Sequence, residues 1–182
     1  MFQRRKKRPP FERIRGFLWP HMGWRRFATY VRLRIIRLNA TPYQIACGLA
    51  FGASISFIPL PGTHILLAAL LTFMVRGNVL ASALGTIIGN PWTFPFMWWG
   101  AYKVGVKAFT FFDVPVAQMP ATFEWHDLVS EAEHHPFELL VPWITGGFLL
   151  GLVLWPVFYY FYYRLVCTTR RKHAVHRRKR AV

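Results

Sequence analysis

The chain has 182 residues, of which 54% are hydrophobic and 18% aromatic, more than a soluble domain of this length needs for its core. Its net charge of +16 is concentrated at the ends: just over half of the lysines and arginines lie at or before Arg37, and most of the others lie between Arg164 and Arg180. No nucleic-acid recognition motif accompanies these basic ends. The apolar composition indicates a membrane protein, and because cytoplasmic segments of membrane proteins are rich in lysine and arginine, we predict that both termini lie in the cytoplasm.

The charge pattern divides the chain into three parts. Residues 1–40 form a basic cytoplasmic segment, residues 41–163 a membrane domain, and residues 164–182 a basic cytoplasmic tail. Six of the seven carboxylates lie between residues 113 and 138, which we predict to be an external loop inside the membrane domain. The N-terminus has Arg4 to Arg8 followed by two prolines instead of an early apolar run, so we expect no cleavable secretory signal.

An amphipathic helix is predicted at the end of the N-terminal segment. Apolar residues recur there at helical spacing, and arginines occupy much of the remaining surface. The apolar residues are Trp24, Phe27, Val31, Ile35 and Leu38. Such a helix suits the anionic cytoplasmic surface of a membrane, and packing against the protein's own membrane body explains the pattern equally well.

The stretch from Thr41 to Val75 contains no lysine, arginine, aspartate or glutamate. As one helix it would be roughly 50 Å long, against a hydrocarbon core of about 30 Å. Thr41 and Pro42 suit a helix start, and the segment Pro59 to Gly62 predicts a break that separates a helix ending near Phe57 from a second one at 64–75. Both pieces are short for a crossing, which favours a re-entrant hairpin and leaves two short crossings as the alternative.

Two further membrane elements follow. Residues 79–102 are uncharged but are interrupted by polar residues and prolines at 90–95, which predicts a broken crossing helix. Lys103 and Lys107 follow it, and the sequence leaves their side of the membrane open. After a short amphipathic helix predicted between Thr122 and Pro136, residues 139–163 form a continuous apolar span, typical of a regular transmembrane helix.

The predicted fold is therefore an all-α membrane protein. It combines proline-broken re-entrant or short helices with one regular transmembrane helix and a cytoplasmic amphipathic helix. Three pairs of glycines spaced four residues apart predict close helix packing, because two missing side chains on one face allow a neighbouring backbone to approach. The pairs are Gly48 and Gly52, Gly85 and Gly89, and Gly147 and Gly151. The partner helices belong either to the same chain or to a second copy, so a homo-oligomer stays open.

Four short motifs between about Thr41 and Lys107 resemble the signature of a bacterial integral-membrane family catalogued as domain of unknown function 2062. They are Ile-Ala-x-Gly-x-Ala-x-Gly at 45–52, Pro-x-Pro-Gly at 59–62, Arg-x-Asn at 76–78 and Gly-Asn-Pro-x-Thr at 89–93. The resemblance implies a small multi-pass protein of the bacterial inner membrane and brings no established activity. His64 stands where the family is expected to have glutamine.

The motifs also define the candidate site. We expect a substrate or an anionic lipid headgroup to bind where the two proline-broken elements meet, since exposed helix ends at membrane depth can hold ions or anions. The candidate residues are Pro59, Pro61, Gly62, His64, Arg76, Asn78, Asn90, Pro91 and Thr93. His64 is either an intramembrane titratable group or a neutral cap of the turn. The two asparagines are either ligands or partners of the opened backbone.

Other chemistry is not indicated. The acidic segment with His126, His134 and His135 lacks a recognised metal spacing, and Cys47 and Cys167 read as small packing residues. No catalytic motif is present, so neither an enzyme nor a cofactor is expected. The predicted function is transport or lipid handling. The alternative is a non-catalytic scaffold whose basic termini bind anionic lipid or a partner protein.

Overall fold

The structure is a computed structural model that describes residues 26, 29, 33–35, 38–60, 62–114 and 136–180. The regular elements of these residues are all helical, which confirms the all-α class. The chain divides into two compact units, Met1–Arg37 and Leu38–Val182, and the elements below belong to the second. In the first unit, residues 26, 29 and 33–35 of the predicted amphipathic helix are helical. Its other residues, and the predicted helix after Thr122, lie outside the described residues.

Helix α3, Pro42–Ile55, lies at the centre of the second unit. It begins as predicted: the Thr41 hydroxyl accepts a hydrogen bond from the Gln44 amide at 3.2 Å, and the Thr41 amide donates to the Gln44 side chain at 2.9 Å. This capping box satisfies two amides that a helix start leaves open, and Pro42 fixes the first turn. Ten of the fourteen residues of α3 are buried, so neighbouring helices enclose it on nearly every side.

Three short elements follow and pack on α3: α4 at Thr63–Met74, α5 at Val79–Gly85 and the 3-10 turn η1 at Thr86–Ile88. Gly48 lies against Asn78 and Ala81, whereas Gly52 lies against Ser82 and Thr86. Helices α3 and α5 therefore run in the same direction, and α4 returns the chain between them. The polypeptide reverses twice within this cluster, which we call the α3 bundle.

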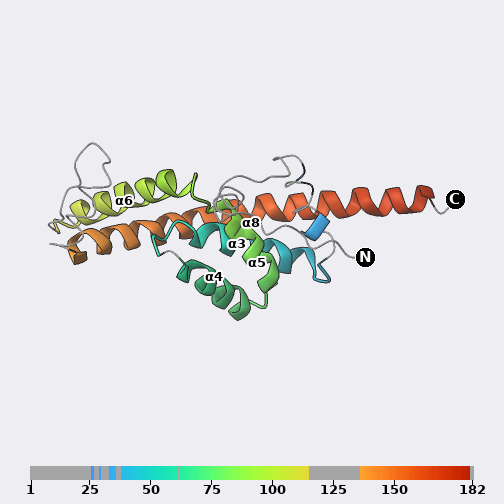
Figure 1. Cartoon of the computed structure of the whole chain (residues 1–182), viewed down its shortest axis with the longest axis horizontal. Helices are drawn as coiled ribbons and strands as arrows, with labels where there is room; N and C mark the ends of the chain where they lie inside the picture. The colour runs from blue at the N-terminus through green and yellow to red at the C-terminus, as the bar shows by residue number, and fades with distance from the viewer. Residues whose placement is uncertain are drawn as a thin grey trace, which may run out of the picture. The chain divides into compact units, whose positions relative to one another are not determined.

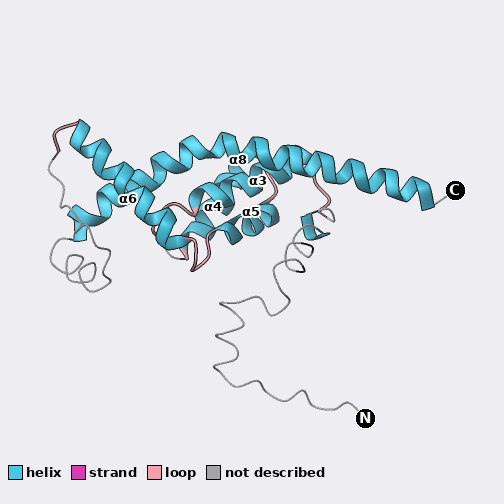
Figure 2. Cartoon of the chain, turned by 90° about the horizontal axis from the view of Figure 1, so that it is seen from above, coloured by secondary structure: helices cyan, strands magenta, loops and turns pink. Residues whose placement is uncertain are grey.

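The remaining helices are α6, Phe94–Phe111, and α8, Pro136–Arg180. Figure 1 shows α6 and α3 lying along successive stretches of α8, an arrangement that the view from above in Figure 2 repeats. The first turns of α8 contact α6, where Gly105 meets the Pro142 carbonyl. Farther along, Trp155 packs on Phe51 with ring centroids 5.2 Å apart, and α8 is thus the common support of both regions.

Helix α8 extends well beyond the apolar span predicted for it, because its 45 residues include the basic tail through Arg180. Arginine, lysine and alanine are good helix formers, and neither glycine nor proline follows Tyr163, so nothing local ends the helix there. The Arg170 guanidinium also donates to the Leu38 carbonyl at 2.9 Å, which fixes this part of α8 to the start of the α3 bundle. Helix α6 likewise continues past Tyr102, so that Lys103 and Lys107 are helical.

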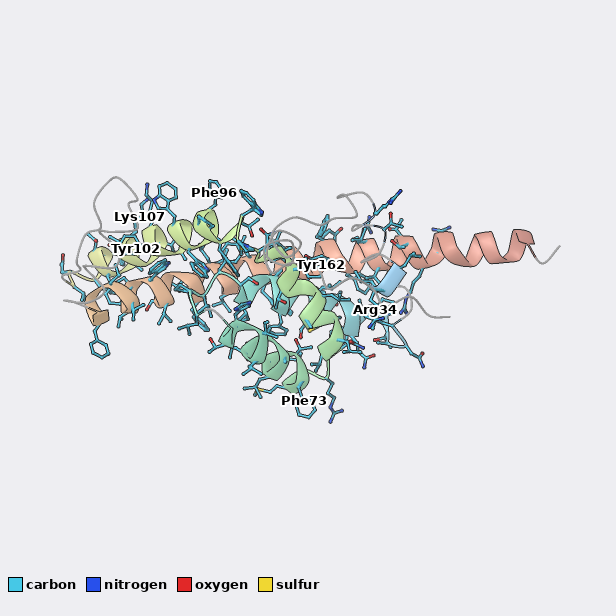
Figure 3. The ribbon with its side chains drawn as sticks, viewed as in Figure 1. Arg34, Phe73, Phe96, Tyr102, Lys107 and Tyr162 are labelled. Carbon is cyan, nitrogen blue, oxygen red and sulfur yellow. The ribbon has the colours of Figure 1, made fainter. Side chains whose placement is uncertain are left out.

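Large apolar side chains cover the outside of the unit. Leu66 and Phe73 on α4 are 73% and 72% exposed, and Figure 3 shows Phe73 at the outer edge of that helix. Within the described residues one helix is long and apolar enough to cross a membrane, the part of α8 at Leu139–Arg171. Its exposed face carries Leu152, Val153 and Val157. This composition indicates membrane association.

Candidate functional site

The first proline break is the turn between α3 and α4. Pro59 is buried, and Gly62 has a φ of 86°, a conformation that glycine adopts without the strain a side chain would bring. Gly62 and Thr63 are exposed, and the space that a side chain at Gly62 would enter is open. No side-chain hydrogen bond caps the start of α4, and its first turn has no acidic residue. Pro61 lies outside the described residues.

His64 lies one residue into α4 and is 8% exposed. Its ring nitrogen Nδ1 is 3.3 Å from the Leu60 carbonyl oxygen, which only accepts, so this contact requires the proton on Nδ1. This hydrogen bond is the one expected of a histidine that caps the turn. The ring also meets Phe94 edge to face, with centroids 5.8 Å apart. Since Phe94 is the first residue of α6, the two broken elements come together at this pair.

The second break, between η1 and α6, is held by its own polar side chains. The Asn90 side-chain oxygen accepts hydrogen bonds from the amides of Trp92 and Thr93, at 2.9 and 3.1 Å. The Thr93 hydroxyl donates to the Ile88 carbonyl at 2.5 Å and accepts from the Asn90 amide at 3.0 Å. Pro91 is exposed between them. Asn90 and Thr93 therefore satisfy the backbone that the break opens.

Aromatic side chains surround the meeting point. Phe94 stacks on Trp98 at 4.6 Å, and Trp98 meets Trp143 of α8 edge to face at 6.2 Å. The indole of Trp98 donates to the Ser56 carbonyl at the end of α3, at 3.3 Å, and that of Trp143 donates to the Trp98 carbonyl at 2.7 Å. These contacts join α3, α6 and α8 around the breaks. The only sign of this aromatic cluster in the sequence is the high density of tryptophans at 92–99.

Arg76 and Asn78 lie at the other end of the α3 bundle. The Asn78 side chain caps α5 by accepting from the Ala81 amide at 2.9 Å, and the Asn78 amide donates to the Gln44 carbonyl near the start of α3 at 2.9 Å. Arg76 is exposed and has a φ of 55°. Since the breaks lie at the other end of α3, a helix of 14 residues, the two groups are separated by about 20 Å. The candidate residues therefore divide into two sets.

The breaks lie beside the apolar part of α8. A Cβ atom at Gly147 would be 2.6 Å from the Phe57 carbonyl oxygen, and one at Gly151 would be 2.9 Å from that of Ser54. Both glycines lie well between Leu139 and Tyr163, the limits of the span predicted from the sequence. The turn that follows α3 therefore reaches α8 away from either end of this span.

The predicted packing glycines lie at contacts within the chain. Gly48 and Gly52 face α5, Gly85 faces the Leu49 backbone, and Gly147 and Gly151 face the end of α3. Gly89 differs, because it follows η1 and lies against Ser56 and Phe94 outside any helix. Sequence reasoning missed the closest pair, Gly105 of α6 and Gly146 of α8, since neither belongs to a four-residue spacing of glycines.

The described residues contain no group of three metal-ligating side chains, and the acidic segment with its histidines lies outside them. The family model described as an uncharacterised protein conserved in bacteria, domain of unknown function 2062, matches residues 25–175. This match confirms the resemblance drawn from the motifs and extends it on both sides of Thr41 to Lys107. No curated protein and no solved structure matches the chain.

Proposed function

We propose a function on the premise that the chain belongs to the bacterial family catalogued as domain of unknown function 2062. The protein is a multi-pass, non-catalytic protein of the inner membrane that handles anionic lipid. Its site is the exposed start of α4, where the two proline breaks meet. Of the residues predicted from the sequence, this site keeps Pro59, Gly62 and His64 and adds Thr63, and the second break is its structural support.

The proposed topology follows from the lengths of the helices. With 14 and 12 residues, α3 and α4 are about 21 and 18 Å long, too short to cross a hydrocarbon core of about 30 Å. The α3 and α4 pair is then a re-entrant hairpin that enters and leaves on one side. Helices α5 and α6 form one broken crossing and α8 forms the return crossing, so both basic termini lie in the cytoplasm.

The observation that carries the proposed activity is the start of α4, which has no side-chain cap and follows the turn whose residues Phe57 and Ile58 lie against Gly147 of α8. Of its backbone amides, that of His64 donates to the Leu60 carbonyl at 3.3 Å. Lipid tails cannot hydrogen-bond to backbone amides, so an exposed helix start at this depth needs water or a polar ligand. The N-terminus of a helix carries a partial positive charge, and no acidic side chain in the first turn of α4 opposes it. An anionic headgroup matches both requirements, as anionic substrates do at broken helices in transporters.

The proposal is tested by a Thr63→Glu variant compared with Thr63→Gln. A carboxylate at the first helical position favours an isolated helix by about 0.3–1 kcal/mol, but it repels an anionic ligand. We expect native mass spectrometry to show a co-purifying anionic lipid on the wild type and the Gln variant, and its loss from the Glu variant. Equal lipid retention by all three proteins would contradict lipid handling at this site, provided that all three insert into the membrane.

A second candidate function is a membrane-anchored scaffold, in which the broken helices serve only packing. It is favoured by the fact that Asn78, Asn90 and Thr93 all direct their side chains to nearby backbone. Under this proposal the basic ends carry the activity, so removal of residues 172–182 abolishes binding to anionic vesicles or to a partner. Thr63→Glu would then leave that binding unchanged.

A further inference from the structure

The face of α6 that points away from α8 has its own chemistry. Phe96 and Trp99 are 79% and 46% exposed, and Lys103 and Lys107 follow on the next two turns of the same face. Figure 3 shows Phe96 and Lys107 projecting from α6 on the side away from α8. The buried residues Ala101 and Gly105 lie on the opposite side. The outward face therefore changes along α6 from aromatic to cationic.

The packing of α6 on α8 gives the depth of these lysines. Gly105, midway between them, meets the Pro142 carbonyl, whereas Arg170, much farther along α8, binds the Leu38 carbonyl. At about 1.5 Å per residue, the separation of Pro142 and Arg170 along the helix is roughly 42 Å, more than the hydrocarbon thickness of about 30 Å. On the topology of the proposed function, on which this inference rests, the two lysines lie at the external surface of the membrane.

Cations at that surface run against the usual charge distribution of inner-membrane proteins. Neither lysine forms an ion pair with another described residue. The Lys103 ammonium lies 3.8 Å from the centroid of the Trp99 ring, an arrangement that holds the cation over an aromatic face. Two lysines one turn apart can both reach one phosphate, and the exposed rings of Trp99 and Phe96 below them offer contact to acyl chains.

We propose that this face of α6 binds the headgroup phosphate of an anionic phospholipid in the external leaflet of the inner membrane. Lys103 and Lys107 contact the phosphate, and Trp99 and Phe96 contact the first part of the acyl chains. A lipid fits better than free phosphate because the cations continue directly into an exposed aromatic surface. This site is distinct from the start of α4 and from the basic termini.

The test uses a photoreactive amino acid at Gly100, where a side chain meets nothing within 4 Å. The full-length protein is reconstituted with phosphatidylglycerol or phosphatidylcholine and irradiated. We expect preferential cross-linking to phosphatidylglycerol that falls roughly tenfold or more in a Lys103→Gln, Lys107→Gln double variant and is retained when both are arginine. A matched variant with Arg164→Gln and Arg171→Gln, two exposed cations of α8, keeps the cross-link.

Equal capture of the two lipids, or an unchanged cross-link in the double Gln variant, overturns the proposal. A Lys107→Cys variant that also carries Cys47→Ala and Cys167→Ala distinguishes a failure of this site from a failure of the topology. Labelling by a membrane-impermeant maleimide in intact spheroplasts places position 107 outside, so an absent lipid preference then removes the α6 site alone. Labelling only after permeabilisation removes the topology and with it the site.

Discussion

The α3 bundle and the pair formed by α6 and α8 solve the same packing problem differently. In α3, ten of fourteen residues are buried, whereas only three of eighteen are buried in α6. The small residues of α3 allow several helices to approach its backbone, and α6 instead packs along one side of α8 through a glycine contact and tryptophan rings. Both helices therefore lie along α8, but α3 is enclosed on its other sides by three short elements, whereas α6 keeps an exposed outer face.

The largest expected effect is that of Gly52→Val in the α3 bundle. Added side-chain atoms would collide with the backbone of Ser82 and Gly85, which cannot move without separating α3 from α5. We expect a loss of about 4 kcal/mol or more, enough to expose the buried thiol of Cys47. Maleimide labelling of Cys47 in detergent measures it, with Gly100→Ala as the control because its surroundings are open. An unlabelled Cys47 in the Gly52 variant would contradict this packing.

Gly105→Val tests the other region. The new side chain would meet the carbonyl of Pro142, so α6 must move away from α8. We expect a loss of about 3 kcal/mol, since the outer face of α6, with Phe96 and Trp99, is exposed among the described residues and the helix can shift toward that side. Labelling of the same thiol tells the two regions apart. In the Gly105 variant Cys47 should stay protected from maleimide, while proteolysis between α6 and α8 becomes faster. Labelling of Cys47 as strong as in the Gly52 variant would mean that the two regions unfold together.

Trp143→Phe removes the indole that donates to the Trp98 carbonyl at 2.7 Å but keeps an aromatic ring. Its expected cost is about 1–2 kcal/mol, measured as a lower thermal unfolding midpoint in detergent. Trp98→Phe, which loses a longer hydrogen bond of 3.3 Å to Ser56, should cost less. The reverse order would indicate that contact with α3, rather than with α8, fixes α6.

The smallest expected effect is that of Asn78→Ala, which removes the cap of α5 at the end of the α3 bundle away from the breaks. We expect a loss of about 1 kcal/mol, and Asn78→Ser should recover most of it because serine also caps helices. Lipid retention at the start of α4 should be unchanged in both variants. A loss of lipid from Asn78→Ala but not from Asn78→Ser would mean that Asn78 contributes to the same lipid site as His64.

Local signals in the sequence predicted local structure well. Thr41, Pro42 and the prolines of both breaks act on the residues beside them, and the helices begin and end near these positions. We expected from the sequence that the two proline-broken elements meet, but the contacts that join them, such as that of Trp98 with Ser56, link distant segments and are encoded by no spacing in the sequence. The sequence likewise does not show that the candidate residues form two sets: Asn78 and Asn90 have the same chemistry, but they lie near opposite ends of α3.

Helix α8 continues as a helix past Tyr163 to Arg180. From Tyr163 to Arg180 the helix rises by about 25 Å, whereas electrostatic attraction is screened over about 8 Å at physiological ionic strength. On the proposed topology, with Tyr163 at the water boundary and α8 upright, the last turns of the helix extend beyond the distance over which lipid phosphates attract cations. Spin-label distances between positions 163 and 178 would measure this helical extension, which on the proposed topology lies in the cytosol.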